Sequence, residues 1–350
     1  AIIYREVQLA GARRQYALAA TAMSGSLGVV LAPCLLIVVI AALNKQVTTQ
    51  VLYGWGIWVF LLTSSLFFII SQMMRKQKIQ IESVSVALPA SARALGPVSP
   101  YIVLTLVVVY FYKFVLDTKL DEFTAPMILP VILLAIVIFD KMRRYEPRMP
   151  ELPHTPNHSE RRIGLEEAIR IATNDTIGHI GALILLMALS VAVGGTIERS
   201  GIMEAVPHSF GNIWLALSLL MVLLIFVGMI MDPLGAIILV TATVAPVAYN
   251  NGIHPVHFWM IVLTAFELGY LSPPVALNQL LTRQVVGEKE MEDADEEVRN
   301  ESFYYRYERW ILPLLVMVPA LLIVVYGGAF VDWDYKGAGF FDWLPHFRLP

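Results

Sequence analysis

Long apolar stretches separated by polar connectors follow one another along the chain. They run from about 16 to 43, 51 to 74, 98 to 116, 123 to 139, 177 to 197 and 310 to 326. Most are close to the roughly 20 residues that an α-helix needs to cross the hydrocarbon core of a bilayer. The pattern therefore predicts an all-α integral membrane protein.

Two further apolar stretches are interrupted by helix-breaking residues. The stretch 213–249 is too long for one span of about 20 residues, and it is broken at Gly228–Pro233. Asp232 can cap the helix that follows the break, and Pro233 suits its first turn. We therefore expect a re-entrant hairpin at 213–249. A second stretch, 256–286, is broken at Glu267–Pro274, which predicts a broken helix.

The composition agrees with a membrane location and excludes several functions. Hydrophobic residues make up 57% of the chain and charged residues 15%, against nearly half and a quarter in soluble domains. The net charge of −3 and the absence of a basic stripe argue against nucleic-acid binding. A single cysteine, Cys34, excludes an intrachain disulfide. Because no nucleophile elbow, Walker loop or dinucleotide fingerprint is present, an enzyme is not expected.

Basic residues concentrate in three connectors, at 75–78, 141–162 and 283–309. Such connectors normally lie on the cytoplasmic side, here of a bacterial inner membrane. The number of spans between them is consistent only if 213–249 returns to its own side. This count supports the hairpin independently and predicts a multi-pass protein.

With this topology, the stretches 16–43 and 256–286 run in opposite directions and carry similar breaks. The matching residues are Ser26-Leu27-Gly28 followed by Ala32-Pro33, and Glu267-Leu268-Gly269 followed by Pro273-Pro274. Two broken helices of opposite direction indicate inverted repeats around a site near the membrane midplane. A chance match of so short a pattern, or helix breaks without any site, is the alternative.

The domain organisation follows from these elements. We expect a broken helix of the first repeat in 1–50, scaffold helices with a cytoplasmic loop and an amphipathic arm in 51–175, the second repeat in 176–286, and an acidic connector, last span and aromatic tail in 287–350. The polar connector before the third span contains Pro89, Gly96 and Pro97 as expected breakers.

The breaks carry the candidate chemistry, because unwound backbone leaves carbonyl oxygens that sodium can satisfy at membrane depth. The candidate cation-binding residues are Ser24, Gly25, Ser26, Gly28, Gly228, Met231, Asp232, Gly269, Ser272 and Pro273. The candidate substrate-binding residues are Pro274, Asn278, Glu267 and Thr241, near a half-helix whose positive end suits a carboxylate. Helix capping is an equal alternative for Asp232, and packing for Thr241. Glu267 could be a cation ligand, a proton site or the partner of a missing arginine.

Two weaker candidates have structural interpretations. His254 and His257 flank Pro255, but two ligands without a neighbouring carboxylate make a poor metal site. A structural role at the membrane edge is the better interpretation. The acidic run 288–301 lacks the glycine and spacing of a calcium loop, so a solvated connector is expected.

The segment from Gly228 to Asn278 closely resembles the large membrane subunit of tripartite ATP-independent periplasmic (TRAP) transporters. The resemblance rests on Gly228-Met-Ile-Met-Asp-Pro-Leu, Gly252-Ile-His-Pro-Val-His-Phe, and Glu267-Leu-Gly-Tyr-Leu-Ser-Pro-Pro-Val-Ala-Leu-Asn278. Weaker similarity extends from Tyr16 to about Val325, and Thr21–Gly28 resembles the first broken helix of the family.

The resemblance implies a sodium-coupled elevator transporter of carboxylates. It also implies a small membrane subunit and a periplasmic substrate-binding protein as partners, and sodium ions, with no cofactor, bound between the hairpin tip and the broken helix. The first hairpin of the family is expected before Ala1, in an upstream segment or a separate chain. Two departures are Ala32-Pro33 in place of two prolines and a longer acidic connector. A non-transporting assembly component that retains the fold is the alternative function.

Overall fold

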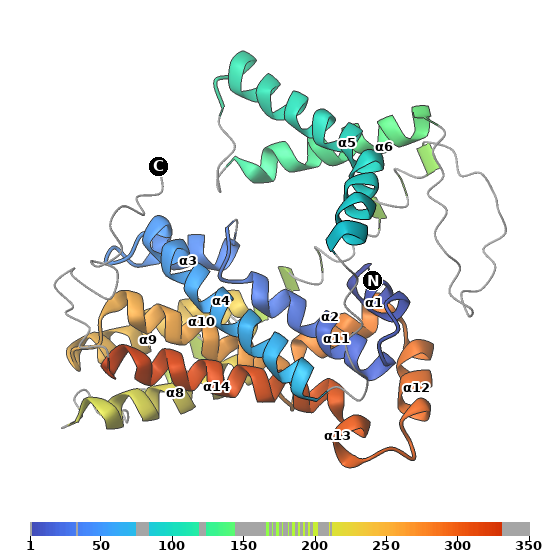
Figure 1. Ribbon diagram of the computed structural model, residues 1–350. Helices are drawn as coiled ribbons and strands as arrows, with labels where there is room; N and C mark the ends of the chain where they lie inside the picture. Colours follow the sequence, from blue (N-terminus) through green and yellow to red (C-terminus); the bar gives the residue numbers. More distant parts are fainter. Residues whose placement is uncertain are drawn as a thin grey trace. The chain divides into compact units, whose positions relative to one another are not determined.

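The computed structural model describes residues 2–32, 34–74, 84–118, 124–143, 210 and 212–330, with isolated positions between 166 and 201. Contacts divide the chain into two compact units, 77–185 and 1–76 with 186–350. Within the described residues every regular element is a helix (Figure 1). This confirms an all-α protein. The expected arm at 165–174, the span 177–197 and the tail after 330 lie largely or wholly outside the described residues.

The smaller unit contains two helices packed along each other, α5 (Val84–Val115) and α6 (Ala125–Arg143). Tyr101 meets Phe139 edge to face, with ring centroids 5.9 Å apart. The expected break at Pro89, Gly96 and Pro97 is wrong, since α5 continues through all three. A helix satisfies nearly all of its own backbone groups, so in an apolar setting it tolerates the lost N–H of a proline better than an irregular connector would.

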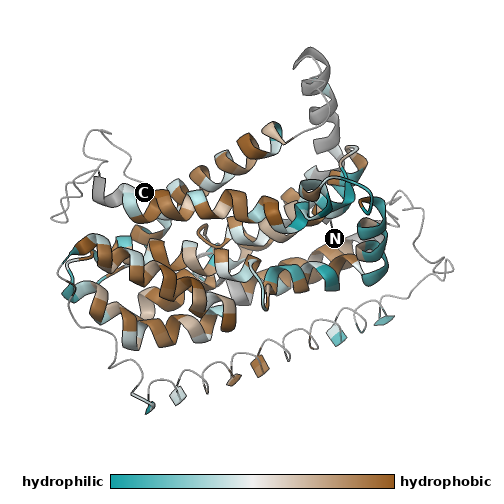
Figure 2. Cartoon of the chain, turned by 90° about the horizontal axis from the view of Figure 1, so that it is seen from below, coloured by the Kyte–Doolittle hydropathy of each residue, from teal (hydrophilic) through white to brown (hydrophobic). Residues whose placement is uncertain are grey.

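The larger unit holds the other helices. They are α1 (Ile2–Leu9), α2 (Arg14–Gly28), α3 (Leu35–Leu43), α4 (Thr49–Met73), α8 (Ile213–Ile230), α9 (Pro233–Asn250), α10 (Pro255–Leu271), α11 (Leu277–Val286), α12 (Glu288–Glu297), α13 (Phe303–Arg306) and α14 (Glu308–Phe330). Four described helices are long and apolar enough to cross a membrane: Thr49–Met73, Ile213–Ile230, Pro233–Asn250 and Glu308–Gly327. Figure 2 shows apolar residues along most of this unit and polar residues gathered near the N-terminus.

Helix α10 is the centre of the larger unit. Every residue from Val256 to Leu271 is buried, as expected for a helix that is apolar on nearly all sides. It packs mainly against α8 and α14. The contact with α8 is a crossing of two glycines, because a Cβ on Gly269 would lie 2.6 Å from the carbonyl carbon of Gly228. Glycine is therefore required at this crossing by the close approach of the two backbones.

The run 288–301, expected as a solvated connector, begins with ten helical residues, of which six are exposed. These residues form α12, which packs on α1 and α2 through the buried Ala294. Gln15 Nε2 donates to the carbonyl oxygen of Ala294 at 3.1 Å and to Asp295 at 2.8 Å. Arg14 lies within 3.8–3.9 Å of three acidic side chains, those of Glu290, Asp293 and Glu297. The acidic run is thus paired with partners that lie some 280 residues earlier in the chain.

Candidate functional site

The first break lies later than expected. We predicted unwound backbone at Ser24–Gly28, but these residues form the last turns of α2, and α3 does not begin until Leu35. The hydroxyl of Ser24 donates to the carbonyl of Thr21 at 2.7 Å, as serine does inside a helix. A Cβ on Gly25 or Gly28 would meet nothing within 4 Å. The irregular backbone is therefore found, among the described residues, at 29–32 and 34.

Tyr53 of α4 satisfies part of this irregular backbone. Its hydroxyl accepts from the N–H of Cys34 at 3.0 Å and donates to the carbonyl of the same residue at 3.1 Å. Backbone groups released by a broken helix need such partners where water is scarce. No sequence pattern indicates this role, because nothing in the pattern distinguishes this tyrosine from any other aromatic residue of an apolar span.

The second break lies at the expected position in the hairpin. α8 ends at Ile230, Met231 is extended and buried, and α9 begins at Pro233. The Asp232 carboxylate accepts from the N–H of Leu234 at 3.0 Å and from that of Gly235 at 3.3 Å. The capping role that competed with a functional role for Asp232 is therefore present in the structure.

The third break separates α10 from α11 at residues 272–276. The hydroxyl of Ser272 donates to the carbonyl of Leu268 at 2.7 Å and closes the end of α10. Pro273 and Pro274 follow, joined by a cis peptide bond and exposed. α11 begins at Leu277, three residues after Pro274, so Asn278 lies in its first turn as predicted. Ala276, which directly precedes α11, has a left-handed backbone with φ of 49°.

Side chains from the end of α2 and the start of α11 meet. Asn278 Nδ2 donates to the hydroxyl of Ser26 at 2.7 Å, across 252 residues of sequence. The carboxylate of Glu267 lies against both groups. Glu267 is only 3% exposed, and its Oε2 has no hydrogen-bond partner among the described residues. The structure thus gathers three predicted site residues, from α2, α10 and α11, into one buried polar cluster.

Two other features extend this cluster toward the hairpin. The Gly228–Gly269 crossing lies two residues from Glu267 along α10, which brings the end of α8 beside it. Tyr270 is buried, lies within electrostatic range of both Glu267 and Asp232, and its hydroxyl has no described hydrogen-bond partner. The sequence analysis did not include Tyr270 among the candidate site residues, although it lies within the Glu267–Asn278 motif that carries the family resemblance.

Thr241 is the predicted site residue that the structure places elsewhere. Its hydroxyl accepts from Asn44 Nδ2 at 3.2 Å, and Asn44 also donates to the carbonyl of Ile40 at 2.9 Å. This pair joins α9 to the end of α3. The packing role that we kept open for Thr241 is thus observed, and its contact with a substrate stays a prediction.

Both histidines have structural partners. His254 caps α10, its Nδ1 accepting from the N–H of Val256 at 3.2 Å. His257 is buried, and its Nε2 lies 2.9 Å from the carbonyl oxygen of Val324 in α14. The two rings therefore fix the start of α10 and its contact with α14.

The sequence as a whole matches a known protein family. The family described as "Tripartite ATP-independent periplasmic transporter, DctM component" matches residues 1–328. The chain belongs to this family. The resemblance seen in Gly228–Asn278 is confirmed, and the protein is a TRAP-family membrane permease component.

Individual relatives are distant and longer than the matched regions. An isethionate TRAP transporter permease protein, DctMQ, from Oleidesulfovibrio alaskensis is 26% identical over 158 residues, which are 43% of this chain and 22% of the relative. A C4-dicarboxylate TRAP transporter large permease protein from Pseudomonas aeruginosa is 32% identical over 74 residues, which are 21% of this chain and 17% of the relative. The sialic acid TRAP transporter large permease protein SiaM from Vibrio cholerae is 26% identical over 170 residues, which are 46% of this chain and 35% of the relative. The matched regions thus cover well under two thirds of these relatives.

Proposed function

We propose that this chain is part of the large membrane subunit of a sodium-coupled importer of small organic anions in a bacterial inner membrane. The observation that carries the proposal is the meeting of two broken helices at Asn278 and Ser26 in a chain of the TRAP family. Paired helix breaks supply both the carbonyl oxygens that hold a cation and the helix ends that face a substrate.

Sodium would be held at the hairpin tip and the third break. Candidate ligands are backbone carbonyls near Met231 and at 272–276, with the hydroxyl of Ser272 beside them. The oxygen-rich cluster of Ser26, Glu267 and Asn278 lies next to these breaks. These are hard oxygen donors, which suit a hard cation, and backbone carbonyls can approach it closely beside glycine.

The substrate would be a carboxylate or a similar small anion. The first turn of α11 presents the side chain of Asn278, and a helix N-terminus favours negative charge. The names of the three relatives include isethionate, C4-dicarboxylate and sialic acid, all organic acids. We infer that a small membrane subunit and a periplasmic binding protein work with this chain, and that a transport domain moves against a scaffold in an elevator fashion.

Uptake into proteoliposomes tests the proposal. The complete permease containing this chain, the small subunit and a cognate binding protein would be reconstituted, and uptake of labelled carboxylates would be followed with and without an inward sodium gradient. Uptake that requires both sodium and the binding protein is expected. A folded complex that transports no organic anion under any gradient would overturn the proposal and favour a non-transporting membrane component.

A further inference from the structure

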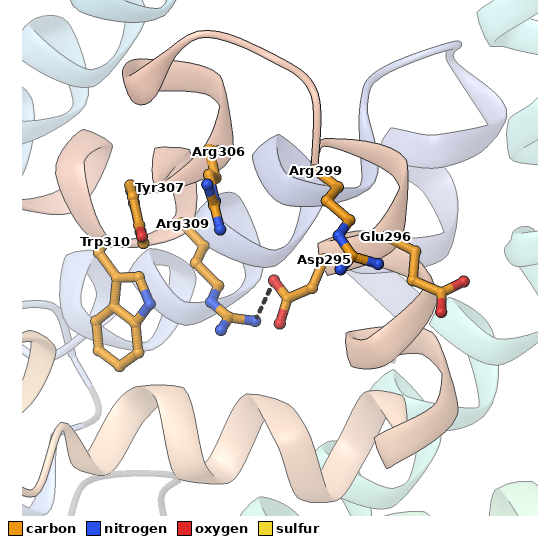
Figure 3. A pocket seen from close by; sticks show the side chains of 7 residues that line it. All are labelled: Asp295, Glu296, Arg299, Arg306, Tyr307, Arg309 and Trp310. Atoms are coloured by element: carbon orange, nitrogen blue, oxygen red, sulfur yellow. Dashed lines mark ion pairs between the residues drawn. The ribbon is translucent and has the colours of Figure 1, made fainter.

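An arginine-lined cavity lies where α12, α13 and α14 meet. It has a volume of about 360 Å³ and is lined by Asp295, Glu296, Arg299, Arg306, Tyr307, Arg309 and Trp310 (Figure 3). Three guanidinium groups thus share one opening with two carboxylates. Neither the candidate site nor the family match accounts for this concentration of positive charge.

Among the described residues, two of the three guanidinium groups have no carboxylate partner. Arg309 Nη1 lies 3.3 Å from Asp295, which also accepts from Gln15. Within the described part of the chain, Arg299 and Arg306 form no ion pair. Figure 3 shows the carboxylate of Glu296 turned away from the other side chains. The cavity therefore has an uncompensated positive charge.

Part of the acidity of α12 does not offset this charge, because three of its seven acidic side chains lie around Arg14. Glu290, Asp293 and Glu297 gather around Arg14. Tyr4 also donates to Glu290 at 2.9 Å, and burial together with that carboxylate raises the pKa of the Tyr4 phenol, so it stays a donor. The α12 acids named here thus face α1 and α2, and the arginines face the cavity.

Aromatic side chains and the start of a span surround the guanidinium groups. Arg306 lies over the ring of Tyr307 and Arg309 over that of Trp310, each 5.6 Å from the ring centroid. Such contacts hold guanidinium groups in place while leaving their N–H donors available. Trp310 stands on the first turn of the apolar stretch Glu308–Gly327. Tryptophan at the end of a span is typical of headgroup depth.

We propose that this cavity binds a phosphate group, supplied by the headgroup of an anionic phospholipid. Paired guanidinium groups match phosphate oxygens with parallel hydrogen bonds. Trp310 and Tyr307 would contact the glycerol region, and the first turns of α14 would lie beside the acyl chains. A soluble phosphate ester offers the same chemistry without the apolar contact, so it is the second source to be tested.

The test compares lipids on the purified full chain. Thermal stability and native mass spectra would be recorded with added phosphatidylglycerol, phosphatidylcholine, or soluble glycerol phosphate. The test variant is Arg299→Gln with Arg306→Gln. The control is Arg283→Gln with Lys289→Gln, which makes the same change in net charge at exposed positions outside the cavity. Because all four side chains are exposed, we expect both variants to fold.

We expect phosphatidylglycerol to bind and to stabilise the wild type and the control, and its affinity to fall at least about tenfold in the test variant. Phosphatidylcholine should bind more weakly in all three. Binding of glycerol phosphate that also depends on Arg299 and Arg306 would support the site and assign it to a soluble ester. Lipid binding that is equal in the test variant and the control, with no phosphate effect on the wild type, would overturn the proposal.

Discussion

Asn278 donates a hydrogen bond of 2.7 Å to Ser26, and this bond joins the first broken helix to the half-helix that follows the third break. The two residues are 252 positions apart in sequence. Both lie against Glu267, whose carboxylate is almost completely buried. The link fixes how the two breaks face each other, and it is the contact on which the proposed cation and substrate sites depend most directly.

Removing this link should impair transport more than it impairs folding. Asn278→Ala deletes the donor to Ser26 and leaves buried acceptors with one partner fewer, at a cost of about 1–3 kcal/mol. We expect sodium-dependent uptake to fall at least about tenfold while membrane insertion is retained. In a double-mutant cycle with Ser26→Ala, the two losses should be clearly less than additive. Strictly additive losses would show that the two side chains do not act together.

The glycine crossing gives a prediction about packing. Gly269→Ala places a Cβ 2.6 Å from the Gly228 carbonyl carbon, so α8 and α10 must move apart. Overpacking of this kind costs about 1–3 kcal/mol, and more when backbone must shift. The matched control is Gly54→Ala in α4, where a Cβ meets nothing within 4 Å. The control should be neutral or stabilising by about 0.5–1 kcal/mol, since alanine favours a helix. Thermal unfolding of both purified variants measures the difference.

Two substitutions of Asp232 separate its role as a helix cap from a role of its negative charge in cation binding. Asp232→Ala removes the acceptor for the N–H groups of Leu234 and Gly235, which should cost about 1 kcal/mol and weaken uptake. Asp232→Asn preserves the cap, because asparagine caps as well as aspartate. If the carboxylate also serves the cation, the Asn variant should be as stable as wild type but require more sodium for half-maximal uptake. Wild-type sodium dependence in this variant would leave Asp232 with a capping role alone.

Tyr53 should control the geometry of the first break. Tyr53→Phe removes the hydroxyl that satisfies both the N–H and the carbonyl of Cys34. The N–H of Cys34 then loses its partner, while the carbonyl keeps the N–H of Val38 at 3.3 Å, which predicts a destabilisation of about 1–3 kcal/mol. The same change at the exposed Tyr110 provides the control and should be close to neutral. We also expect Cys34 to react faster with a small thiol reagent in the Tyr53 variant. An unchanged rate would contradict the assigned role.

Arg13 and Glu308 form a bidentate ion pair at the polar end of the larger unit. Arg13 Nε and Nη2 contact the two carboxylate oxygens at 3.0 and 2.6 Å, and Glu308 is 1% exposed. Arg13→Ala leaves a buried carboxylate without its partner, which should cost about 3–5 kcal/mol. Replacing both residues, as Arg13→Met with Glu308→Leu, should recover much of this loss. A double variant as unstable as Arg13→Ala would show that the charge of Glu308 is not the cause.

The sequence by itself determined the class of the protein and the positions of its breaks within a few residues. Apolar runs of span length and an Asp232-Pro233 pair placed the hairpin tip between α8 and α9. This was possible because helix length, capping and proline chemistry act over a few neighbouring residues. The family followed from the same local motif. The expectation that Pro89 and Pro97 break the helix was wrong. Whether a proline ends a helix depends on whether water can bond the released backbone groups, which local sequence does not show.

Only the tertiary structure decided which residues share a site. Three contacts show this: the hydrogen bond between Asn278 and Ser26, the hydrogen bonds between Tyr53 and Cys34, and the packing of α12 on Gln15. In each case the sequence pattern of one segment does not predict its contact with the other. Thr241 has the right chemistry for a site but is paired with Asn44, because α9 lies against α3. Which side chains meet depends on how the helices cross, and that is fixed by close packing such as the Gly228–Gly269 contact rather than by local propensity.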